Sequence, residues 1–105
     1  MNIQFKKGVL DMCVLAVVAD GDCYGYELVQ RISENIEIAE GTIYPLLRKL
    51  QTEGYCETYL TESSGGPPRK YYRLTPSGRK MLDSMKVEWD HFSKNVDKIL
   101  FKGGI

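Results

Sequence analysis

The chain contains few of the residues on which catalytic and metal sites depend. It has one histidine, His91, and three cysteines, Cys13, Cys23 and Cys56, whose spacing does not match a metal site. No serine–histidine–aspartate set, cysteine–histidine pair or glycine-rich phosphate loop can be recognised. We therefore expect reduced thiols that are buried or incidental, and no catalytic residue, metal or cofactor. An enzyme is the least favoured class of protein.

Charge of one sign and long apolar runs are also missing. The 14 basic and 14 acidic residues cancel, so nucleic acid could be bound only by a local basic patch. The longest apolar run covers residues 12–19 and is far shorter than the roughly 20 residues that span a bilayer. Residues 1–7 have no signal-peptide core behind them. We therefore expect a cytoplasmic protein without a membrane partner.

The remaining composition is ordinary for one folded domain, with 43% hydrophobic and 27% charged residues. Residues 9–18 are apolar on nearly every side, which indicates a helix buried at the centre of the fold. A second helix is expected over about residues 24–35, with an outward Glu27–Arg31 pair four residues apart.

A third helix should begin between residues 39 and 42 and end before Gly54. Ile43 and Leu47 recur on its inner side. We expect Pro45 in its first turn, because a helix tolerates proline there and not in its interior.

Two β-prone segments follow at residues 55–61 and 70–74, separated by a polar loop over residues 63–68. A helix with an exposed polar stripe, followed by a hairpin with a basic tip, is the arrangement of a winged helix-turn-helix domain. In such domains the helix enters the major groove and the hairpin, or wing, contacts the adjacent backbone. The fold class expected is mainly α with a small β-hairpin.

We expect the polar stripe and the basic wing to bind double-stranded DNA. Hydroxyl groups and a helix N-terminus can bond phosphates or base edges, and arginine and lysine can reach phosphates. The alternative for the polar residues of the third helix is that they are ordinary surface residues that contact only water. The expected DNA-binding residues are Thr42, Tyr44, Pro45, Arg48, Lys49, Arg69, Lys70 and Arg73.

The last helix should start at Thr75 and Pro76, which supply an N-cap and a first-turn proline. Its apolar residues repeat with heptad spacing and predict a homodimer interface, although a helix packed on its own domain would show a similar stripe. The expected domains are residues 1–75 for DNA binding and residues 76–105 for dimerisation. The expected interface residues are Leu82, Met85, Trp89, Phe92, Val96 and Ile99.

Several motifs resemble those of the PadR family of transcriptional regulators, in the right order and spacing from about Gly8 to Gly78. They are Gly8-Val9-Leu10, Tyr24-Gly25-Tyr26-Glu27-Leu28, Gly41-Thr42-Ile43-Tyr44-Pro45-Leu46-Leu47 and Arg69-Lys70-Tyr71-Tyr72-Arg73-Leu74-Thr75. The single C-terminal helix is similar to that of the smaller members. The resemblance implies a dimeric, usually repressing DNA-binding protein with a near-palindromic operator.

The resemblance also implies a place for an effector, since a small molecule releases some members of the family from DNA. Trp89, with Phe92, would then line a site for a planar aromatic molecule at the dimer interface. A winged-helix protein-interaction module that does not bind DNA remains the alternative, because a fold does not decide a function.

Overall fold

The helix α1 (Ile3–Asp20) forms the centre of the fold, as its apolar pattern predicted. In the computed structural model, which describes residues 3–102, it packs against α2 (Gly25–Ser33), α3 (Glu40–Thr52) and α4 (Pro76–Leu100). From residue 8 onward, the almost fully buried side chains of α1 are Leu10, Val14, Leu15 and Val18. One hydrophobic core therefore holds all four helices of the described residues.

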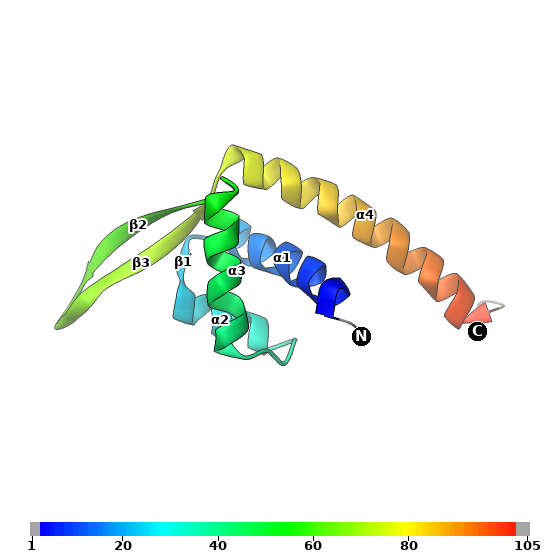
Figure 1. The fold of residues 1–105 in the computed structure, drawn as a ribbon, viewed down its shortest axis with the longest axis horizontal. Helices are drawn as coiled ribbons and strands as arrows, with labels where there is room; N and C mark the ends of the chain where they lie inside the picture. Colours follow the sequence, from blue (N-terminus) through cyan, green and yellow to red (C-terminus); the bar gives the residue numbers. More distant parts are fainter. Residues whose placement is uncertain (1–2, 103–105) are drawn as a thin grey trace.

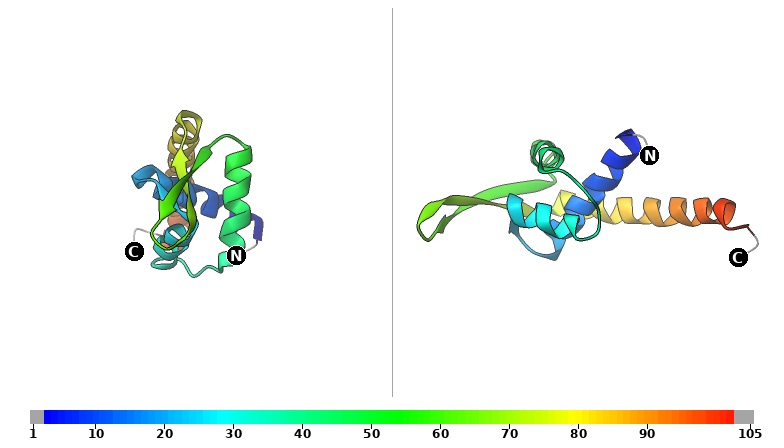
Figure 2. Two further views of the ribbon diagram at one scale, coloured as in Figure 1. Left: turned by 90° about the vertical axis from the view of Figure 1, so that its left-hand side faces the viewer. Right: turned by 90° about the horizontal axis from the view of Figure 1, so that it is seen from below.

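A small antiparallel sheet completes the fold. Its strands β1 (Cys23–Tyr24), β2 (Cys56–Ser63) and β3 (Gly66–Leu74) lie in the order β1-β3-β2. The β2–β3 hairpin and α4 extend from the core in opposite directions (Figures 1 and 2), so the molecule is elongated, 58 × 27 × 21 Å. The predicted winged-helix fold is confirmed, with the two-residue strand β1 as an addition.

The wing is longer than predicted because Gly66, Pro67 and Pro68 belong to β3 and not to the loop. The outer half of β3, residues 66–70, pairs with β2 and has no other partner strand among the described residues, because β1 pairs only with Tyr71 and Tyr72. Backbone N–H positions alternate between the two edges of a strand, so only one of the two adjacent prolines can face the free edge, where no amide proton is needed. Both lie opposite the irregularity in register between Thr61 and Ser63 of β2, where the regular ladder of hydrogen bonds is interrupted.

The bounds of α3 agree with the prediction, and Gly54 ends the helix with a φ of +82°. The reason given for its start was wrong, because Pro45 is an interior residue of the helix and not part of its first turn. Proline removes the hydrogen bond that the carbonyl of Gly41 would accept. Gly41 lies at the exposed start of the helix, where water can reach that carbonyl.

The predicted Glu27–Arg31 pair does not form. The guanidinium of Arg31 bonds Oδ2 of Asp20 at 2.7 Å, and Oε1 of Glu27 accepts a hydrogen bond from the backbone N–H of Tyr24 at 3.2 Å. The turn after α1 brings Asp20 close to α2, and a carboxylate in a first helical turn is drawn to the unpaired amides there.

The start of α4 is capped as predicted. The hydroxyl of Thr75 accepts a hydrogen bond from the N–H of Gly78 at 3.0 Å and donates one to the carbonyl of Gly54 at 2.6 Å. Leu82 is completely buried in the core of its own chain, so it has no surface left to offer a second chain. Its assignment to a dimer interface is therefore corrected: the first turns of α4 close the domain core.

None of the helices within residues 3–102 is both long enough and apolar enough to cross a membrane.

Candidate nucleic-acid interface

The outer face of α3 carries the polar side chains expected from the sequence. Four apolar residues anchor the opposite face in the core: Ile43, Leu46, Leu47 and Leu50. Thr42, Tyr44, Pro45 and Arg48 are exposed, with 40% of Tyr44 open to solvent. The helix therefore presents two hydroxyl groups and a guanidinium on its solvent side.

The register of the hairpin decides which wing residues share this side of the molecule. Tyr72 is buried and Thr58, its partner in β2, accepts a hydrogen bond from the Gln51 side chain of α3 at 3.3 Å. Because side chains alternate along a strand, Lys70 lies on the same face as Tyr72, towards α3. Burial raises the pKa of the Tyr72 phenol, and the neighbouring Tyr44 hydroxyl raises it further. The base of the wing thus adjoins the outer face of α3.

Arg69 and Arg73 lie on the other face of the wing, together with Tyr71. The guanidinium of Arg73 bonds Oε1 of Glu57 at 2.9 Å and lies over a tyrosine ring of β2, 4.9 Å from its centroid. Arg69 lies 4.7 Å from the ring centroid of Tyr24. The three predicted basic residues of the wing therefore lie on two different faces. Lys70 faces α3, whereas Arg69 and Arg73 face away from it.

Lys49 also has a structural partner. Its ammonium group lies 2.8 Å from Oδ2 of Asp11 in α1, whose side chain is 10% exposed. Lys49 was expected to bind DNA, and no role was expected for Asp11, although a lone carboxylate in an otherwise apolar helix is a recognisable signal. We assign this lysine to the contact between α3 and α1.

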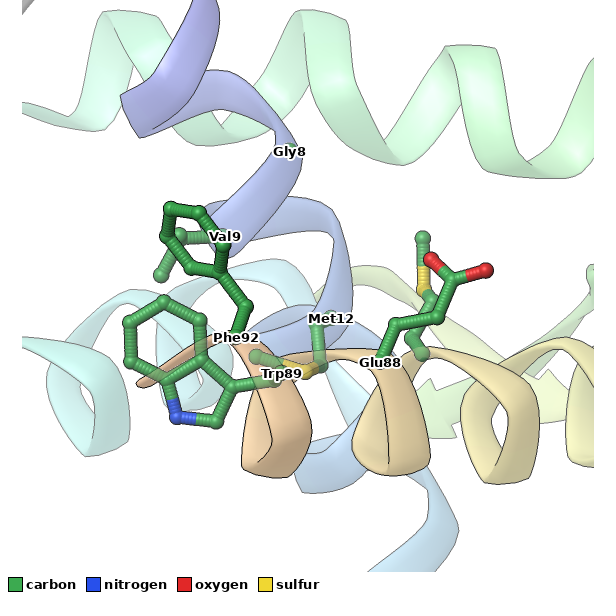
Figure 3. Close-up of a pocket in the computed structure, with 7 residues that line it drawn as sticks. Gly8, Val9, Met12, Glu88, Trp89 and Phe92 are labelled. Atoms are coloured by element: carbon green, nitrogen blue, oxygen red, sulfur yellow. The ribbon is translucent and has the colours of Figure 1, made fainter. Parts of the chain in front are cut away.

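A second feature lies at the far side of the core, where α1 and α4 enclose an open groove of about 550 Å³ (Figure 3). Trp89 and Phe92, the predicted ligand residues, lie side by side on α4 with ring centroids 6.5 Å apart. The groove is lined by Gly8, Val9 and Met12 of α1 and by Met85, Glu88, Trp89 and Phe92 of α4. The contribution of α1 was not predicted, because a helix-wide apolar pattern does not show which side faces a groove.

Two of the cysteines are buried thiols, as expected. Cys23 and Cys56 are each 2% exposed, and burial raises the pKa of each thiol to about 11. Among the described residues no group of three or more histidine, cysteine, aspartate or glutamate side chains is placed to hold a metal ion.

Comparison of the sequence and the structure with known proteins identifies the family. The transcriptional regulator PadR-like family matches residues 14–84. A PadR-like transcriptional regulator from Bacillus cereus is similar in structure, with a TM-score of 0.83, 39% identity and coverage of 92% of this chain and 96% of that one. A PadR family transcription regulator from Clostridium difficile has a TM-score of 0.79 and 33% identity, and the match covers 86% of this chain and 96% of that one.

Among relatives compared by sequence, the negative transcriptional regulator PadR of Bacillus subtilis is 26% identical over 99 residues, which are 90% of this chain and 54% of that protein. The family match covers more than half of the chain and includes α3, the wing and the first turns of α4. The chain therefore belongs to the PadR-like family of transcriptional regulators.

Proposed function

We propose that the protein binds DNA sequence-specifically, with α3 in the major groove and the wing on the adjacent backbone. Members of its family are transcriptional regulators and not enzymes. The observation that supports the proposal most is the shared surface of α3 and the wing, where Tyr44, Arg48 and Lys70 lie on one side of the molecule.

Each group on this surface has a role that its chemistry suits. Thr42 and Tyr44 bond base edges or phosphates through their hydroxyls, and Pro45 contributes apolar contact. Arg48 reaches a phosphate or a guanine edge. Lys70, with Arg69 as a second contact nearer the tip, binds phosphates beside the groove. Arg73, which is paired with Glu57, stiffens the wing.

We propose that α4 joins two chains, with residues 76–105 as the dimerisation helix. Beyond the buried Leu82, exposed apolar side chains recur on one side of α4: Trp89, Phe92, Ile99 and Leu100. Contiguous apolar surface of this kind is usually covered by a partner, and two-fold dimers are the commonest assemblies. A dimer would present two α3 helices to half-sites about 34 Å apart on a near-palindromic operator.

We further propose repression that a planar aromatic molecule relieves by entering the groove at Trp89 and Phe92. A guest wedged between α1 and α4 would change the spacing of the two α3 helices and favour the form released from DNA. Trp89 is the only tryptophan, so its fluorescence reports on the groove when planar cationic dyes or phenolic acids are added. Quenching is expected, and an unchanged signal with every compound, in a protein that remains dimeric, would contradict the effector.

Selection from a pool of random DNA duplexes, followed by mobility-shift titration, tests the DNA-binding proposal. We expect one near-palindromic sequence to be enriched and bound at least 1,000-fold more tightly than a scrambled duplex, on the order of specific regulators. The DNA upstream of the protein's own gene is the first natural fragment to test. Failure to enrich any duplex would favour the alternative, a winged-helix module that binds another protein. We also propose a cytoplasmic location, where chromosomal DNA is accessible.

A further inference from the structure

Tyr44 of α3 lies directly against Gly25, the first residue of α2. A Cβ atom built on Gly25 would lie 2.6 Å from Cε1 of Tyr44 and 3.4 Å from its Cζ and hydroxyl oxygen. Real side-chain contacts do not approach as closely as 2.6 Å, so any residue other than glycine would displace the ring. The absence of a side chain at Gly25 is what allows Tyr44 its observed orientation.

The backbone does not require glycine at this position. The positive-φ glycines of the described chain are Gly54 and Gly65, and Gly25 takes the first helical position of α2, where any L-residue can adopt the backbone conformation. The space occupied by Tyr44 is therefore the physical reason for glycine here, and not the backbone conformation.

The Tyr44 ring is only partly covered by the protein. Tyr44 keeps 40% of its surface open to solvent, so it could rotate away if Gly25 did not leave room for it. A tyrosine on the exposed face of α3 has several rotamers to choose from. The space left at Gly25 is what makes the observed orientation available to the ring.

We propose that Gly25 is a positioning residue for DNA recognition, which acts by holding the Tyr44 hydroxyl in the direction that meets the operator. This inference rests on the proposed DNA-binding function. It assigns part of the specificity to a residue of α2 that lies outside the expected DNA-binding set and acts through a neighbouring helix.

A double-mutant cycle on the selected duplex tests the proposal. Gly25→Ala is expected to weaken binding about tenfold, the scale of one specific contact, and to leave binding to a scrambled duplex unchanged. Tyr44→Ala should give a similar loss. In the Tyr44→Ala background, Gly25→Ala should cause no further loss, because the ring that it displaces is already gone.

Gly21→Ala is the matched control, since a Cβ on Gly21 would meet no described atom within 4 Å. This variant should bind like the wild type. Full-strength binding by Gly25→Ala, or an equal loss when it is added to Tyr44→Ala, would overturn the positioning role. A wild-type protein that binds no duplex would overturn the proposed function itself, which separates the two failures.

Thermal unfolding of the same variants tests whether weaker DNA binding is caused by loss of the folded structure. Gly25→Ala should melt like the wild type, because the displaced ring can swing into solvent. If it melts lower, adding Tyr44→Ala must restore the melting temperature, since the clash is then removed. If the double variant still melts at a lower temperature, glycine at position 25 is needed for the backbone conformation and not for the Tyr44 ring, which would contradict the proposal.

Discussion

Lys49 of α3 and Asp11 of α1 form an ion pair of 2.8 Å between Nζ and Oδ2. The two residues are 38 positions apart in the chain, and the pair joins the outer helix of the winged domain to the central one. The hydrogen bond with Asp11, strengthened by the negative charge of its carboxylate, raises the pKa of Lys49. Asp11 is almost buried, so the ammonium group of Lys49 compensates a carboxylate that little water can reach.

Removing Lys49 should therefore destabilise the protein. Lys49→Met should lower the free energy of unfolding by about 1–3 kcal/mol, because it leaves a nearly buried carboxylate without its partner. Lys94→Met is the control, since Lys94 pairs with Asp90 at 2.9 Å on the exposed surface of α4 and should change stability by less than about 0.5 kcal/mol. Urea unfolding measures both, and equal losses would contradict a special role for the Asp11 pair.

The buried thiols should make the protein less stable at alkaline pH. Burial raises the pKa of Cys23 and Cys56 to about 11 from an ordinary 9.0, so the unfolded thiols ionise first as the pH rises. Their contribution is complete below pH 9 and is lost as the pH rises to about 11. Urea unfolding between pH 8 and pH 10.5 should show a falling midpoint. The Cys23→Ala/Cys56→Ala variant should show a shallower fall, and an identical slope would assign the effect to other groups, such as Lys49.

Gly78 should not tolerate a side chain. A Cβ on Gly78 would collide with the carbonyl oxygen of Tyr55 and lie 2.8 Å from Cδ1 of Leu74, and a backbone carbonyl cannot swing aside. We expect Gly78→Ala to cost about 1–3 kcal/mol of stability. Gly41→Ala, whose Cβ would meet no described atom within 4 Å, should be neutral or stabilising by up to about 1 kcal/mol. Thermal unfolding compares the two, and equal melting temperatures would refute the close packing.

Lys70 should matter for the salt dependence of DNA binding. Lys70→Ala should weaken binding to the selected and scrambled duplexes alike and reduce the slope of log affinity against log salt by about one unit. Arg69→Ala should reduce the slope by less, because its guanidinium lies over Tyr24 on the opposite face. Lys94→Ala removes the same charge at a distance and should leave the slope unchanged. An unaltered slope in Lys70→Ala would remove the wing from the interface.

The exposed end of α4 should determine the oligomeric state. Ile99 is 75% exposed in the single chain, so Ile99→Asp should yield folded monomers if α4 joins two chains. Lys98→Asp tests whether added negative charge alone has this effect, and it should remain dimeric. Sedimentation measures the mass, and circular dichroism confirms folding. A wild-type protein that sediments as a monomer at micromolar concentration would contradict the dimer.

The sequence by itself determined the features that depend on neighbours a few residues apart. The apolar periodicity predicted α1 and α3, Thr75 predicted the start of α4, and Gly54 predicted the end of α3. These signals are reliable because helical faces and caps are set by contacts within one or two turns. The division into polar and apolar faces of α3 followed from the same periodicity.

Tertiary structure alone decided which residues become partners across the fold. Arg31 pairs with Asp20 and not with Glu27, and β3 continues through Pro67 because one of its edges is free. Such contacts depend on the path of the chain between distant segments, which no local spacing records. The position of Tyr44 shows the difference most clearly. Its place on α3 could be read from the sequence. Its orientation depends on the space beside Gly25 of α2, where a side chain is missing. Only the packing of α2 against α3 brings this space next to the Tyr44 ring.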